Sequence, residues 1–123
     1  MKYLLLYLAA VLPVLWGIAH LFPTKSVVKG FGDISADNKR IITMEWINEG
    51  ATLIFIGILI FIVTFIDNAH IISKYIYALC FIMLNTLSVI SLFTGFKVDF
   101  LPYKLCPVIF TSSSVLIVLG YYL

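Results

Sequence analysis

The chain has 123 residues, of which 63% are hydrophobic and 11% charged, and its mean hydropathy is +1.12. Soluble globular domains are nearer half apolar and a quarter charged, so the composition excludes an ordinary soluble domain. It predicts an integral membrane protein whose residues 1–123 form a single domain in a lipid bilayer. The net charge of +2 is too small and dispersed to favour a nucleic-acid partner. The sequence also has no glycine-rich phosphate loop and no zinc-type Cys/His spacing, so we expect no metal site, and no residue pattern identifies a cofactor.

Four long apolar stretches predict four membrane-spanning helices, since about 20 apolar residues cross a bilayer. The expected helices cover residues 3–22, 36–66, 72–94 and 104–122. Ser35 or Asp37 is the expected N-cap of the second helix, which therefore projects beyond the bilayer for its first turns. The predicted fold is all-α, a four-transmembrane-helix bundle with up-down topology and a long second helix.

The distribution of cations predicts the orientation in the membrane. Six of the eight Lys and Arg residues lie in the connections 23–45 and 94–104, and the other side holds only Lys2 and Lys74. Positive residues favour the cytoplasmic side. We therefore expect these two connections in the cytoplasm, both termini outside, and the plasma (inner) membrane as the location.

The two cysteines, Cys80 and Cys106, lie in apolar surroundings. Buried, unreactive thiols are the default expectation for such positions. The predicted spans place them near opposite membrane faces, so a disulfide between them is not expected.

A polar stripe marks the start of the apolar part of the second helix. Glu45, Asn48, Glu49 and Thr52 follow the spacing i, i+3, i+4, i+7, which places them on one helix face. The run from Gly50 to Ile66 is only about 25 Å long as a helix, shorter than the bilayer core of about 30 Å. Glu49 is therefore expected inside the boundary, where a lipid-facing carboxylate would cost about 2.5–3.5 kcal/mol. The stripe should turn toward the bundle.

His20 is the expected partner of Glu49, because the first helix leaves the bilayer just after it, at a similar depth. A carboxylate beside an imidazole can move a proton or hold a polar head group, so both are candidate catalytic residues. The alternative is a structural hydrogen bond that joins the first two helices.

Other polar and aromatic residues are expected to complete a pocket. It opens toward the connections 23–45 and 94–104 and is closed at the far end, where the second helix beyond Thr52 is almost purely apolar. The candidate ligand-binding residues are Asn48, Glu45, Asn85, Ser88, Trp16 and Trp46. For Asn85 and the serines, including those of the run 111–114, hydrogen bonding between helices is the competing interpretation.

Two stretches resemble a known family. WGIAHLFPT (16–24), followed by EWINEGATLIFIGILI (45–60), resembles the first half of DoxX-like proteins. These are small four-helix membrane proteins whose second span carries an acidic residue before a glycine-rich helix. His20 stands where that family often has lysine, so shared chemistry does not follow from the resemblance. It implies a four-span fold, and some members are associated with quinone-linked sulfur oxidation.

The leading hypothesis is a polar pocket inside the membrane that binds or acts on a small amphipathic molecule, such as a quinone, isoprenoid or lipid. A second hypothesis is a non-enzymatic subunit in which the polar cluster clamps helices together. It could then form a homo- or hetero-oligomer through the face that carries Gly50 and Gly57, because small residues allow close helix packing. A third is a small proton-coupled transporter. The sequence does not decide whether the protein is an enzyme.

Overall fold

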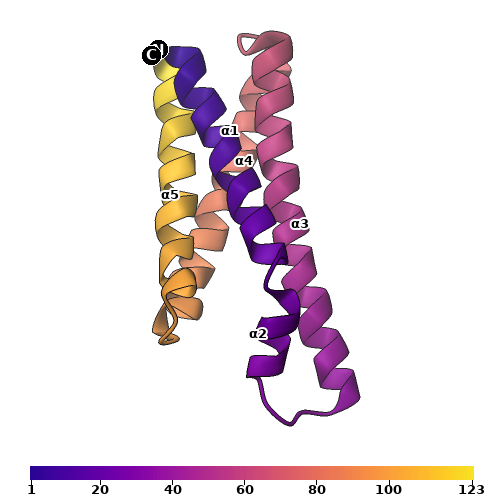
Figure 1. Cartoon of the computed structure of the whole chain (residues 1–123). Coiled ribbons are helices and arrows are strands. Elements are labelled where there is room, and N and C mark those ends of the chain that lie inside the picture. Colours follow the sequence, from indigo (N-terminus) through magenta and orange to yellow (C-terminus); the bar gives the residue numbers. More distant parts are fainter.

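Four long helices run alternately up and down the molecule and lie side by side (Figure 1). The computed structural model describes all 123 residues; 87% of them are helical and there is no strand. The elements are α1 (Lys2–Leu21), α2 (Thr24–Gly30), α3 (Ala36–Asp67), α4 (Ile71–Phe93), the 3₁₀ turn η1 (Gly95–Lys97) and α5 (Leu101–Tyr122). The helices α1, α3, α4 and α5 are long and apolar enough to cross a membrane. This confirms the all-α four-helix prediction and is compatible with an integral membrane protein.

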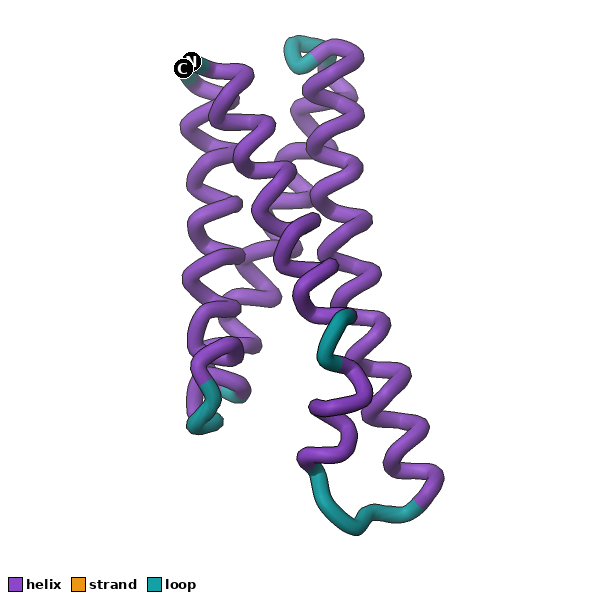
Figure 2. The backbone as a smooth tube through the Cα atoms, viewed as in Figure 1, coloured by secondary structure: helices purple, strands orange, loops and turns teal.

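The short helix α2 was not predicted. The chain leaves α1 through Phe22 and Pro23, and the Thr24 hydroxyl donates a 2.6 Å hydrogen bond to the Leu21 carbonyl. Proline has no N–H group to continue the helical ladder, so the helix is interrupted there and restarts. A segment of seven residues has too little periodicity to be recognised from sequence. In the backbone trace, α2 runs beside the first turns of α3, and only a short loop joins the two helices (Figure 2).

Helix α3 begins where its cap was predicted. The Ser35 hydroxyl accepts a 3.1 Å hydrogen bond from the Asn38 N–H, which satisfies one of the free donors at the helix start. Its 32 residues extend about 48 Å, against about 30 Å for a bilayer core. The end of α3 that carries residues 36–44 accordingly reaches past the ends of α4 and α5 (Figure 1).

Helix α5 begins at Leu101, three residues before the predicted start at 104. Pro102 was assigned to the connection, but it lies in the first helical turn. The N–H that proline lacks has no partner in that turn, so proline costs little there. At the opposite end of the bundle, His70 caps α4, because its Nδ1 accepts a 3.2 Å hydrogen bond from the Ile72 N–H.

Glycines let α1 and α3 pack in close contact. A Cβ placed on Gly17 would lie 2.6 Å from the Gly50 carbonyl oxygen. One on Gly57 would overlap Val14 and lie 2.5 Å from the carbonyl oxygen of Ala10. The face that carries Gly50 and Gly57 is thus covered by α1 of the same chain. An oligomer contact through this face, which the sequence suggested, would require α1 to leave.

Polar side chains also join helices at the end of the bundle that holds the termini. The hydroxyls of Thr64 in α3 and Tyr77 in α4 are 2.9 Å apart, and both residues are buried. The Ser73 hydroxyl donates to the Asp67 carbonyl oxygen beside them. This end is therefore less apolar than predicted, and its hydrogen bonds tie α3 to α4.

Ser113 joins α5 to α1. Its hydroxyl donates a 2.6 Å hydrogen bond to the Ala9 carbonyl oxygen, and the residue is fully buried. The bond confirms the packing interpretation for this serine.

We expect Ser113→Ala to lower the free energy of unfolding in detergent by about 1 kcal/mol, because hydrogen bonds between membrane helices have about this strength. Unfolding by titration with sodium dodecyl sulfate, followed by circular dichroism, measures the change. Ser112→Ala removes a neighbouring hydroxyl on the exposed face and is the matched control. Equal stability of the two variants would contradict a stabilising role for the α5–α1 bond.

Candidate functional site

The bundle is open at the end that holds α2 and η1. There α3 diverges from α4 and α5 (Figure 1), and a cavity of about 540 Å³ lies between the three helices. We call it the front cavity. It is lined by Ile41, Ile42, Glu45, Trp46, Asn48, Glu49, Thr52, Leu87, Ile90, Ser91, Thr94, Tyr103 and Cys106. It is located where the sequence predicted a pocket, next to the first and third connections.

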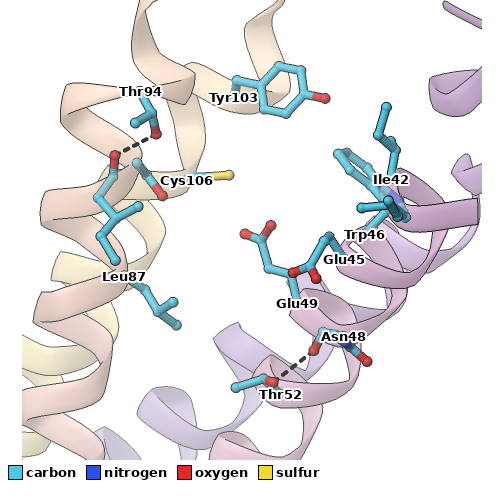
Figure 3. A pocket seen from close by; sticks show the side chains of 13 residues that line it. Ile42, Glu45, Trp46, Asn48, Glu49, Thr52, Leu87, Thr94, Tyr103 and Cys106 are labelled. Carbon is cyan, nitrogen blue, oxygen red and sulfur yellow. Dashed lines mark hydrogen bonds between the residues drawn. The ribbon is translucent and has the colours of Figure 1, made fainter. Parts of the chain in front are cut away.

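The polar stripe of α3 forms one wall of the front cavity. The carboxylates of Glu45 and Glu49 point into the space between α3 and the α4–α5 pair (Figure 3). Asn48 and Thr52 lie along the same wall, and the Thr52 hydroxyl donates a 2.7 Å hydrogen bond to the Asn48 carbonyl oxygen. The i, i+3, i+4, i+7 spacing therefore does bring these four residues to one cavity.

The opposite wall is mainly apolar and aromatic. Leu87 and Ile90 of α4 face the stripe, and Tyr103 and Cys106 of α5 complete the wall. A ligand here would meet carboxylates on one side and hydrocarbon on the other, an arrangement suited to an amphipathic molecule.

His20 and Glu49 meet, as predicted. The His20 Nε2 atom lies 3.5 Å from the Glu49 Oε2 atom; the His20 side chain is only 5% exposed and that of Glu49 is 37% exposed. No hydrogen bond forms at Nε2, because the distance exceeds the usual range of about 2.7–3.2 Å. The imidazole nitrogen is therefore buried without a hydrogen-bond partner, and its nearest carboxylate also faces the front cavity.

Trp46 fixes the position of His20. The two rings are stacked, with centroids 3.7 Å apart and planes 15° apart. The Trp46 indole N–H donates a 2.7 Å hydrogen bond to the His20 carbonyl oxygen. These contacts join the end of α1 to α3, so the imidazole cannot turn freely, and Glu49 is the more exposed member of the pair.

A smaller cavity of about 170 Å³ lies behind the His20–Trp46 contact, which we call the His20–Trp46 joint. We call this smaller cavity the rear cavity. Its lining residues are Trp16, Ala19, His20, Pro23, Val27, Trp46, Phe100, Pro102, Tyr103 and Cys106. Trp46, Tyr103 and Cys106 line both cavities and form the wall between them. The rings of Tyr103 and Trp46 meet edge to face, with centroids 5.9 Å apart. His20 lines the rear cavity and Glu49 the front one, so the pair spans the wall.

Three predicted ligand-binding residues lie outside the front cavity. The Asn85 amide donates a 2.8 Å hydrogen bond to the Phe81 carbonyl oxygen of its own helix. Ser88 bonds to α5, at 3.1 Å from the Pro107 carbonyl oxygen and 2.8 Å from the Thr111 hydroxyl. Trp16 lines the rear cavity only. Short polar side chains in membrane helices find such nearby acceptors readily, and this packing interpretation accounts for Asn85 and Ser88.

The lining residues that were missed include Tyr103, Thr94 and Cys106. These three lie just after α4 or near the start of α5, and the sequence leaves the rotation of those helices about their axes undetermined. The apolar surroundings of Cys106 were recognised, and both Cys80 and Cys106 are free and buried.

The site thus combines two carboxylates, an amide, a buried imidazole and two aromatic rings around a space large enough for a small organic molecule. No three His, Cys, Asp or Glu side chains gather as a metal ion would require. No family model, curated protein or solved structure matches this chain, so the chemistry of the site must be inferred from its own residues.

Proposed function

We propose that this protein binds a small amphipathic molecule, such as a quinone, an isoprenoid or a lipid, in the front cavity. One observation carries the proposal: a cavity of about 540 Å³ with a carboxylate stripe on one wall and apolar side chains on the other. Cavities of about 300–1,000 Å³ with few polar groups are typical of small-molecule sites.

Each wall has its own role in this proposal. Glu49 and Asn48 contact the polar head of the ligand, with Glu45 nearer the opening. The apolar part packs against Leu87 and Ile90, and Trp46 closes the inner end. Where the protein also acts on the ligand, Glu49 exchanges a proton with it and His20 supports the charge that develops on Glu49.

The proposal includes an orientation. The first and third connections lie in the cytoplasm because they hold six of the eight cations, both termini lie outside, and the membrane is the plasma (inner) membrane. The front cavity then opens toward the cytoplasmic face. The four-span layout is also what kinship with DoxX-like proteins requires, and we retain that kinship as part of the proposal.

A second candidate function is favoured by a different contact. The His20–Trp46 stack, with its hydrogen bond to the His20 carbonyl, is what a structural clamp between α1 and α3 needs. In a non-enzymatic membrane subunit, the cluster would serve only this purpose.

Mass spectrometry of small molecules retained after gentle detergent purification distinguishes the two. We expect the natural chain to retain an amphipathic molecule and Glu49→Gln to lose it while keeping its helical content, because glutamine keeps the shape of glutamate without the charge. His20→Ala should lose both the molecule and some stability, since the stack on Trp46 disappears.

Ser112→Ala, a change of an exposed hydroxyl outside both cavities, is the control and should retain the molecule. If Glu49→Gln merely melts earlier and no preparation holds a molecule, the clamp is the function of the cluster.

A further inference from the structure

We infer that the head group selected by the front cavity is an organic cation, an amine or quaternary ammonium group on an apolar body. This inference rests on the proposed function and names the chemical class of its ligand.

The charges at the cavity are unbalanced. Glu45 and Glu49 both point into it (Figure 3), and its thirteen lining residues include no Lys, Arg or His. The Lys and Arg residues that do form ion pairs, Arg40 and Lys104, are bound to Asp37 and Asp99 instead. A cationic ligand would supply the missing countercharge, whereas an anionic one would be repelled.

His20 does not remove this imbalance. It offers one imidazole to two carboxylates, and its Nε2 stops 3.5 Å from Glu49 without a hydrogen bond. The His20 side chain is only 5% exposed and is stacked on Trp46, so it cannot follow Glu49 into the cavity. Glu49 therefore keeps hydrogen-bonding capacity for a ligand, and His20 supports that carboxylate from behind.

The aromatic rings favour the same head group. Trp46 and Tyr103 line the cavity beside the carboxylates, with the edge of one ring toward the other. The faces of tryptophan and tyrosine attract ammonium groups, most strongly when water is excluded, and His20 covers only one of the two faces of Trp46. An inorganic cation is disfavoured, since no three His, Cys, Asp or Glu side chains are grouped so that they could hold one.

The remaining wall accepts an alkyl or ring system. Leu87 and Ile90 of α4 line the side of the cavity opposite the carboxylates, and Ile42 adds an apolar side chain on α3. The ligand class is therefore a cationic amphiphile, with its nitrogen near Glu45 and Glu49 and its hydrocarbon toward α4.

Three probes that share an octyl group but differ in head group test this ligand class: octyltrimethylammonium, 1-octanol and octyl sulfate. Binding is read from the fluorescence of Trp46 in the purified full chain, with Trp16→Phe in the background to leave a single tryptophan. We expect the ammonium probe to bind at least about tenfold more tightly than the other two. Glu45→Gln/Glu49→Gln should abolish the preference, and Glu45→Gln alone, at an exposed position, should reduce it.

Asp33→Asn/Asp67→Asn removes two carboxylates outside the front cavity and should keep the preference. Equal binding of 1-octanol and the ammonium probe, or an unchanged preference in Glu45→Gln/Glu49→Gln, would overturn the inference while leaving an amphiphile site in place. If none of the three probes binds, the proposed function itself fails, and the inference fails with it.

Discussion

Replacing Trp46 with alanine is expected to destabilise the protein by about 3 kcal/mol, the lower end of the range for core aromatic residues, because Trp46 is only partly buried. The indole stacks on His20, donates a hydrogen bond to the His20 carbonyl and meets the ring of Tyr103. Its loss removes the joint between the end of α1 and α3. It also opens the wall between the front and rear cavities, which Trp46 forms together with Tyr103 and Cys106, so the variant that remains folded should lose ligand selectivity.

Unfolding by sodium dodecyl sulfate, read by circular dichroism, measures the stability of Trp46→Ala. Trp46→Phe is the matched control, because it keeps a ring over His20 but has no N–H to donate. We expect it to lie between the natural chain and the alanine variant. If Trp46→Ala unfolds at the same denaturant concentration as the natural chain, the His20–Trp46 joint does not hold α1 to α3.

An alanine at Gly57 is expected to cost a similar amount, about 3 kcal/mol, at the upper end of typical overpacking. The added Cβ would lie 2.5 Å from the Ala10 carbonyl oxygen, a backbone atom that cannot swing aside. The two helices must separate, which also shifts Gly17 away from Gly50 and moves His20 relative to Glu49. Ligand retention should therefore fall together with stability.

Gly30→Ala is the control, since a Cβ there meets no atom within 4 Å. Melting temperatures of the two variants in the same detergent provide the comparison. If Gly57→Ala is as stable as Gly30→Ala, then α1 does not pack against Gly57 of α3 closely enough to exclude a Cβ atom.

The fold could be predicted from the sequence because a bilayer limits the alternatives. Four apolar stretches of sufficient length leave little besides four helices, and Ser35 marked the start of α3 correctly. The restart of the helix after Pro23 and the early start of α5 at Leu101 were missed. Both lie outside the apolar stretches, where the hydrophobic pattern is weak. Proline can also either interrupt a helix, as Pro23 does, or stand in the first turn of one, as Pro102 does.

The candidate site could be predicted in part. Helix geometry explains which residues could be predicted and which could not. Residues on one helix keep a fixed spacing, so the stripe from Glu45 to Thr52 could be assigned to one face without a structure. Contacts between helices depend on rotations about the helix axes, which the sequence does not give. That is why Tyr103 was missed, while Ser88 was assigned to a pocket although it bonds to α5.

The central claim is that the front cavity holds a ligand, and a cavity-filling substitution tests it most directly. Leu87→Trp places a large side chain into the cavity from α4 and leaves the two glutamates, His20 and Trp46 unsubstituted. Retained small molecules are then quantified by mass spectrometry in the natural chain and the variant, after circular dichroism has shown that their helical contents agree. We expect a stoichiometric amphipathic molecule in the natural chain and its loss from Leu87→Trp. Equal retention in both, or no retained molecule in the natural chain, would contradict the central claim.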